Sequence, residues 1–153
     1  GYRGLGEVAI FIFFGLVAVL GTQFTQAGRI GLTGLALAIG IGGMSSAVNL
    51  ANNIRDIPSD TEAGKITLAV RLGDKKSRNL FMWLLLIPVL LTIVIAFDSW
   101  LALAALAYFP FALQAVRTVN RGARGPQLIP VLGITGRAML VWALVSAIAL
   151  FLV

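Results

Sequence analysis

Two aspartates stand four residues apart, Asp56 and Asp60, in the one long polar interruption of an otherwise apolar chain. The same stretch, residues 49–73, also carries side-chain amides and the basic residues Arg55, Lys65 and Arg71. Carboxylate and amide oxygens are the hard ligands that Mg²⁺ takes, together with water and a phosphate oxygen. Guanidinium and ammonium groups donate to phosphate oxygens. These residue types predict a site for a metal ion and a diphosphate.

The polar residues that lead up to Asp56 share one helical face. They stand at offsets 0, 4, 7, 8 and 11, which fall on one side of an α-helix: Ser45, Asn49, Asn52, Asn53 and Asp56. A polar group that faces lipid is penalised, by about 2.5–3.5 kcal/mol for an aspartate at the bilayer centre. We therefore expect this face to line a cavity filled with water or ligand.

The helix is predicted to break directly after Asp56. Pro58 fixes its own φ and disfavours the α conformation of the residue before it. Pro58 also suits the start of a short new helix, with Asp60 and Glu62 in its opening turns and Gly64 at its end. Both aspartates would then lie at the edge of the cavity. A D-x-x-x-D spacing alone is also compatible with solvated carboxylates that only cap helices.

Composition assigns the chain to the membrane proteins. Hydrophobic residues make up 59% of it and charged residues 12%, with a mean hydropathy of +0.95, whereas soluble domains carry about 25% charged residues. The absence of cysteine and histidine excludes disulfides, thiolate metal sites and histidine acid–base chemistry. We attribute the net charge of +6 to loops that face anionic lipid and substrate, and expect no nucleic acid partner.

Five apolar segments are long enough to cross a lipid bilayer, which takes about twenty residues. They are residues 7–26, 32–53, 79–97, 100–116 and 132–153. We expect an all-α, polytopic transmembrane helix bundle, with residues 54–78 as a charged loop. The chain begins at Gly1 without a methionine or a leader pattern, so we expect it to be a piece of a longer protein.

The basic residues predict the orientation of this bundle. Alternating spans place eleven of the twelve on one side and leave only Arg29 on the other. The positive-inside rule then puts residues 54–78 in the cytoplasm, in a protein integral to the plasma membrane.

The run NNIRDIPSDTEAGKITLAVRLG, residues 52–73, closely resembles the second Asp-rich region of the UbiA superfamily of intramembrane aromatic prenyltransferases. GYRGLGE, residues 1–7, resembles the loop before the fifth helix of that family. The Asn-Asn-x-Arg-Asp and Leu-Ala-Val-Arg-Leu-Gly details favour the branch that acts on 1,4-dihydroxy-2-naphthoate in menaquinone biosynthesis. The resemblance implies a nine-helix fold whose helices five to nine, the C-terminal part of one domain, are residues 1–153. The family's other Asp-rich motif is absent here, so the resemblance also implies an N-terminal half as partner.

The resemblance assigns roles to residues of the Asp-rich stretch. It implies that Mg²⁺ on a polyprenyl diphosphate is held by Asn53, Asp56 and Asp60, and that Lys65 and Arg71 steady the diphosphate. The implied catalytic residues are Asp56, Asp60, Lys65 and Arg71; the implied substrate-binding residues are Asn49, Asn52, Asn53, Arg55, Lys65 and Arg71. Tyr2, Arg3 and Glu7 are placed on the side of the aromatic substrate by resemblance alone.

The implied reaction is transfer of the polyprenyl group to 1,4-dihydroxy-2-naphthoate with decarboxylation, giving demethylmenaquinone. The alternatives are other aromatic prenyltransferases of the same superfamily, of the 4-hydroxybenzoate, chlorophyll or haem O type, which differ in the acceptor. A transporter or a non-enzymatic membrane subunit would also need a polar helix face. It would not require carboxylates and basic residues on one loop.

Overall fold

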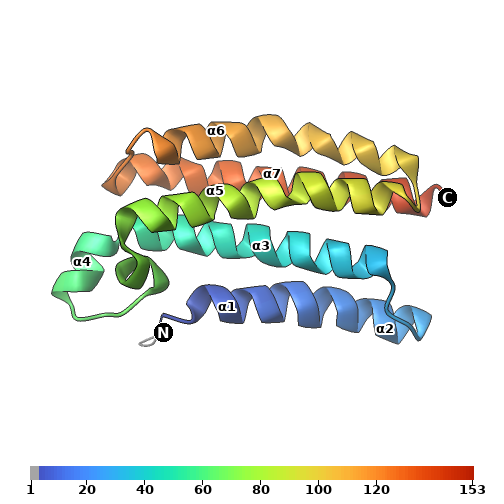
Figure 1. The fold of residues 1–153 in the computed structure, drawn as a ribbon, viewed down its shortest axis with the longest axis horizontal. Helices are drawn as coiled ribbons and strands as arrows, with labels where there is room; N and C mark the ends of the chain where they lie inside the picture. The colour runs from blue at the N-terminus through green and yellow to red at the C-terminus, as the bar shows by residue number, and fades with distance from the viewer. Residues whose placement is uncertain (1–3) are drawn as a thin grey trace.

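The computed structural model describes residues 4–153, whose regular elements are all helices. Five helical segments are long and apolar enough to cross a membrane: Gly6–Ala27, Leu32–Arg55, Leu68–Ala96, Trp100–Asn120 and Gly125–Phe151. They lie side by side and alternate in direction, with the short helix α4 (Ile57–Glu62) beyond one end of the bundle (Figure 1). The expected all-α bundle of five membrane helices is confirmed. Tyr2 and Arg3 lie outside the described residues.

The N-terminal span is one continuous helix made of α1 (Gly6–Ile10), the π-helical η1 (Phe11–Leu20) and α2 (Gly21–Ala27). It packs along α3 (Leu32–Arg55) and leaves most of its apolar side chains exposed. The contact is closest at Gly15, where a Cβ would lie 2.6 Å from the carbonyl oxygen of Ala38 and 2.7 Å from Cα of Gly42. Helices in lipid approach this closely only through such small residues.

Helix α3 lies at the centre of the bundle, in contact with the N-terminal span, α5 and α7. Its buried face is built mainly of alanine and glycine, and Leu50 and Met44 are fully buried beside them. At Gly40 a Cβ would lie 2.3 Å from the ring of Trp142, so the glycine makes room for this ring. The centre of the fold therefore combines small residues of α3 with large side chains, such as Trp142, that fill the space they leave.

Helix α5 (Leu68–Ala96) begins at Leu68, well before the predicted start of the third span at residue 79. Most of residues 54–78, predicted as a loop, is therefore helical. Gly73 interrupts the helix with φ 75° and ψ 167°, a conformation essentially limited to glycine. The charged residues that follow Gly73 lie outside the apolar window, which is why hydropathy placed the start of the helix too late.

The last two spans start with tighter turns. A 3₁₀ segment, η2 (Trp100–Tyr108), precedes α6 (Phe109–Asn120), and η3 (Gly125–Leu128) precedes α7 (Ile129–Phe151). The fourth span begins at Trp100 as predicted and ends at Asn120 instead of residue 116. The fifth span begins at Gly125 instead of residue 132, because its 3₁₀ start was not predicted, and it ends at Phe151.

Two large polar side chains inside the bundle find partners on neighbouring helices. Nε1 of Trp142 donates to Oγ1 of Thr92 at 2.8 Å. The hydroxyl of Tyr108 donates to the carbonyl oxygen of Leu85 at 2.9 Å. Because a hydrocarbon environment offers no water, these contacts satisfy groups that would otherwise destabilise the spans.

Arg78 fixes α5 to the turn between α6 and η3. Its buried guanidinium pairs with Asp74 at 2.8 Å and donates to the carbonyl oxygens of Val119 and Ala123. This end of the bundle also carries α4 (Ile57–Glu62) and the start of α1 (Figure 1). Arg78 thereby holds the helices together at the end of the bundle that carries the charged stretch, residues 49–73.

Candidate functional site

The backbone breaks directly after Asp56, as predicted. Asp56 is the C-cap residue of α3, and α4 follows with Pro58 and Asp60 in its first turn. Gly64 has φ 66°, in the left-handed region, and reverses the chain after α4. The backbone N–H of Lys65 then donates to the carbonyl oxygen of Asp60 at 2.8 Å. The turn after α4 therefore brings Lys65 back beside Asp60.

Lys65 and Asp60 form an ion pair across this turn. Nζ of Lys65 lies 3.1 Å from Oδ1 of Asp60. Asp60 is only 7% exposed, and its Oδ2 is buried without a hydrogen-bond partner among residues 4–153. One oxygen of this buried carboxylate is therefore paired with a cation and the other is left without a partner.

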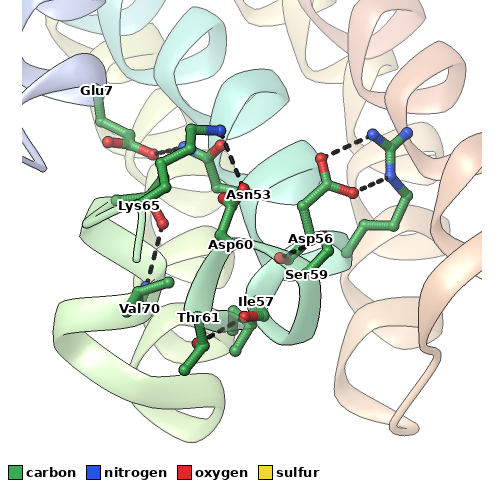
Figure 2. Close-up of polar contacts among 11 residues, drawn as sticks. Glu7, Asn53, Asp56, Ile57, Ser59, Asp60, Thr61, Lys65 and Val70 are labelled. Carbon is green, nitrogen blue, oxygen red and sulfur yellow. Dashed lines mark hydrogen bonds and ion pairs between the residues drawn. The ribbon is translucent and has the colours of Figure 1, made fainter. Parts of the chain in front are cut away.

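A second contact joins α1 to α3 in the same region. Nδ2 of Asn53 donates to Oε1 of Glu7 at 2.6 Å, and Oγ of Ser46 donates to the carbonyl oxygen of Glu7 at 2.9 Å. Glu7 is 4% exposed, and within the described chain its Oε2 has no partner. Figure 2 shows the pair of Glu7 and Asn53 beside the pair of Lys65 and Asp60. The family resemblance places Glu7 on the side of the aromatic substrate, and its contact with Asn53 is not predictable from the sequence.

Asp56 is held differently from Asp60. Its two carboxylate oxygens accept from Nε and Nη2 of Arg55 at 2.7 and 2.8 Å. These hydrogen bonds lower the pKa of the Asp56 carboxyl below its ordinary value, although partial burial opposes the shift. In Figure 2 the Asp56 carboxylate points away from Asp60 and Lys65. The structure therefore brings Asn53, Asp60 and Lys65 together but directs Asp56 to Arg55.

Arg71 lies at the edge of the same region. It is exposed, and its Cδ lies 2.9 Å from the place that a Cβ on Gly4 would occupy, so its alkyl chain runs along Gly4. No ion pair of Arg71 is found among residues 4–153. Its guanidinium is therefore near the site without being fixed in it.

Two cavities meet at the polar face of α3. The polar cavity, about 340 Å³, contains Glu7, Asn53 and Lys65 in its wall. The apolar cavity, about 460 Å³, is lined mainly by hydrophobic side chains of the spans, which are Ile10, Phe14, Val48, Leu132 and Met139. Asn49 and Asn52 belong to both walls. The predicted polar face thus lines a cavity, and its amides lie where a charged compartment meets an apolar one.

The donor set can be compared with the requirements of a magnesium ion. Asn53 and Asp60 fit, because both carry oxygen ligands beside Lys65 and, among residues 4–153, Oδ2 of the buried Asp60 lacks a partner. Asp56 does not share this cluster while it is paired with Arg55. Within the described residues no three acidic side chains are spaced to hold one metal ion. The predicted ligand set of Asn53, Asp56 and Asp60 is therefore assembled only in part.

Residues 1–127 match the model of the UbiA prenyltransferase family. The chain belongs to this family. The UbiA-family assignment agrees with the resemblance of residues 52–73, five of which line the polar cavity: Asn52, Asn53, Lys65, Thr67 and Leu68. In this family member the Asp-rich stretch therefore occupies the end of the bundle where the polar and apolar cavities meet.

Named relatives of this UbiA-family chain cover nearly all of it. It is 54% identical over 99% of its length to the 1,4-dihydroxy-2-naphthoate octaprenyltransferase of Mycobacterium leprae, and 53% identical over 98% to that of Mycobacterium tuberculosis. It is 33% identical over 99% of its length to the protein of the same name from Escherichia coli. The chain spans about half the length of these relatives, 52%, 51% and 50% respectively.

Proposed function

We propose that this chain is the C-terminal part of a membrane prenyltransferase that transfers a polyprenyl group from its diphosphate to 1,4-dihydroxy-2-naphthoate. The reaction releases the carboxyl group of the acceptor and gives demethylmenaquinone. The observation that carries the proposal is the meeting of a polar and an apolar cavity at Asn49 and Asn52. A polyprenyl diphosphate has the same division into a charged head and a hydrocarbon tail. The names of the relatives supply the acceptor.

The polar cavity would hold the diphosphate. Lys65 in its wall and Arg71 at its edge would donate to phosphate oxygens, and Arg55 would add a third donor once released from Asp56. A bound Mg²⁺ would neutralise the charge that develops on the leaving diphosphate. Asn53 and Asp60 would hold that ion, with Asp56 joining them when diphosphate takes Arg55 from it. The amides of Asn49 and Asn52 would bind the substrates where the cavities meet.

The apolar cavity would hold the allylic end of the prenyl chain. Its apolar wall would keep water away from a carbocation that water would otherwise capture. Phe14 presents a ring to this cavity, and an aromatic face attracts a nearby cation. The lipid bilayer outside the helices would take the rest of the prenyl tail, which explains a site built between spans.

Residues 1–153 would correspond to helices five to nine of a nine-helix domain, and an N-terminal half with its own Asp-rich motif would complete the site. The concentration of basic residues at the α4 end supports the proposal that this end faces the cytoplasm of a plasma membrane protein. The chain's length relative to its relatives supports this division.

The test measures transfer of radiolabelled polyprenyl diphosphate to 1,4-dihydroxy-2-naphthoate, with and without Mg²⁺. Membranes would contain the chain alone, or the chain co-expressed with the N-terminal half of the Mycobacterium tuberculosis relative. We expect product only with both halves and Mg²⁺, and little with 4-hydroxybenzoate as acceptor. Absence of product when the two halves co-purify as a folded complex would contradict the proposed reaction. Preference for 4-hydroxybenzoate would move the chain to another branch of the family.

A further inference from the structure

Two buried carboxylate oxygens near Asn53 lack a hydrogen-bond partner within residues 4–153, Oε2 of Glu7 and Oδ2 of Asp60. The two residues are 4% and 7% exposed. Lys65 pairs with the other oxygen of Asp60, and its side chain is 43% exposed. Glu7 forms no ion pair with any described residue. A buried carboxylate oxygen without a partner is destabilising, because it has lost its water without a replacement.

The surroundings of Glu7 indicate which partner is missing. Oε1 accepts from Nδ2 of Asn53, so this amide turns its donor to Glu7 and keeps its carbonyl oxygen for another partner. Oε2 belongs to a side chain in the wall of the polar cavity. Oε2 of Glu7 and the amide oxygen of Asn53, both in residues of this wall, are acceptors only. A hard divalent cation satisfies such a set, whereas a phosphate would be repelled by it.

We propose that Glu7 belongs to the divalent-cation site, as a carboxylate from α1 outside the Asp-rich stretch. One oxygen of Glu7 orients Asn53, and the other is a ligand of the cation. This inference rests on the proposed function for the identity of the cation as Mg²⁺. It gives the N-terminal span, which packs mainly on α3, a direct part in the site.

A purely structural role for Glu7 makes a different prediction. If Glu7 only joined α1 to α3, its loss would weaken the bundle with or without a cation. If Glu7 is a cation ligand, its buried charge destabilises the cation-free protein. Without a cation, Glu7→Gln should therefore melt at the same temperature as the wild type or at a higher one. The two roles therefore differ in the sign of the cation-free effect.

The experiment measures Mn²⁺ binding to the purified chain in lipid nanodiscs, without prenyl diphosphate, from the electron paramagnetic resonance signal of free Mn²⁺. Glu7→Gln keeps the size of the side chain and removes its charge. Ser46→Ala is the matched control, because it removes the hydrogen bond to the Glu7 carbonyl oxygen and leaves the carboxylate in place. Thermal melting in EDTA and in Mg²⁺ accompanies each titration.

We expect Ser46→Ala to bind Mn²⁺ like the wild type and Glu7→Gln to bind at least tenfold more weakly, within the range found for groups that support a metal site. Glu7→Gln should also lose most of the Mg²⁺-dependent rise in Tm. Wild-type affinity in Glu7→Gln, no Mn²⁺ binding by the wild type, or a lower Tm of Glu7→Gln in EDTA would each overturn the inference.

The transfer assay on the same proteins separates this inference from the proposed function. Weakened Mn²⁺ binding in Glu7→Gln, with no transfer by any preparation, would support the cation site and contradict the prenyl transfer. Transfer by the wild type together with unchanged Mn²⁺ binding in Glu7→Gln would support the function and overturn the role of Glu7.

Discussion

Nζ of Lys65 lies 3.1 Å from Oδ1 of Asp60, across the turn that Gly64 makes after α4. The backbone N–H of Lys65 also donates to the carbonyl oxygen of Asp60, so two contacts fix this turn. Lys65 is thereby placed in the wall of the polar cavity with Asn53 and Glu7. The ion pair fixes the ammonium group of Lys65 in the cavity wall, where an anionic substrate can bind it. The same pair partly neutralises the charge of Asp60.

Lys65→Met should weaken binding of the polyprenyl diphosphate. A hydrogen bond to a charged group contributes about 1.5–3 kcal/mol, which corresponds to roughly a ten- to hundredfold rise in KM for the diphosphate. The transfer assay with both halves measures this KM. Lys75→Met removes an exposed lysine of α5 and serves as the control, with KM expected to stay unchanged. Equal KM values in the two variants would remove Lys65 from the diphosphate site.

Asp60→Asn and Asp56→Asn should each abolish most of the prenyl transfer while the protein still inserts into membranes. Asp60→Asn removes a charge from a buried carboxylate that already lacks one partner, and Asp56→Asn breaks the pair with Arg55. Transfer is measured over a range of Mg²⁺ concentrations, and membrane insertion by alkaline extraction. Full transfer in both single variants would rule out the aspartates as holders of the metal ion.

The pair of Arg55 and Asp56 predicts a pH dependence of stability. Its hydrogen bonds lower the folded-state pKa of Asp56 below the ordinary value of 3.8. The pair therefore stabilises the fold at neutral pH, and this contribution is lost as the pH falls from about 4 through the lowered pKa. Melting curves of the wild type and Arg55→Met should differ at pH 7 and converge below about pH 4.

The size of this pH effect is limited by solvent. The side chains of Arg55 and Asp56 are 27% and 28% exposed, so added salt should reduce the difference between the two proteins. Arg117→Met, which changes an exposed arginine of α6, is the control and should follow the wild type at every pH. A difference that stays constant down to pH 3 would show that Arg55 acts through packing instead.

Local rules were sufficient to predict the five helices, the break after Asp56 and a short helix at Pro58, but α4 already includes Ile57, which Pro58 was expected to keep out of the α conformation. Each depends on apolar length or on proline and glycine chemistry within a few residues. The start of α5 was missed because Gly73 joins a short charged segment to the apolar span, and hydropathy reports only the latter.

The candidate site was less predictable than the fold. Glu7 and Asn53 are 46 residues apart in the chain and meet only because α1 packs on α3. The choice of Arg55 as the partner of Asp56, and of Lys65 as that of Asp60, depends on side-chain directions after the break. The spacing of the two aspartates predicted that both lie at the same end of the bundle. It could not predict that their side chains have different partners.

Gly15→Ala should destabilise the contact between the N-terminal span and α3. The added Cβ would meet backbone atoms of Ala38 and Gly42 at 2.6 and 2.7 Å, and backbone atoms cannot move aside as a side chain can. Overpacking of this kind costs about 1–3 kcal/mol. Because the packing of this span on α3 brings Glu7 to Asn53, the variant should also lower Mn²⁺ affinity. Gly21→Ala lies in the same span with no atom within 4 Å of its added Cβ, and should change neither property. Thermal melting and the Mn²⁺ titration of the two variants measure the difference. Equal behaviour of Gly15→Ala and Gly21→Ala would mean that the span is not held against α3 at Gly15.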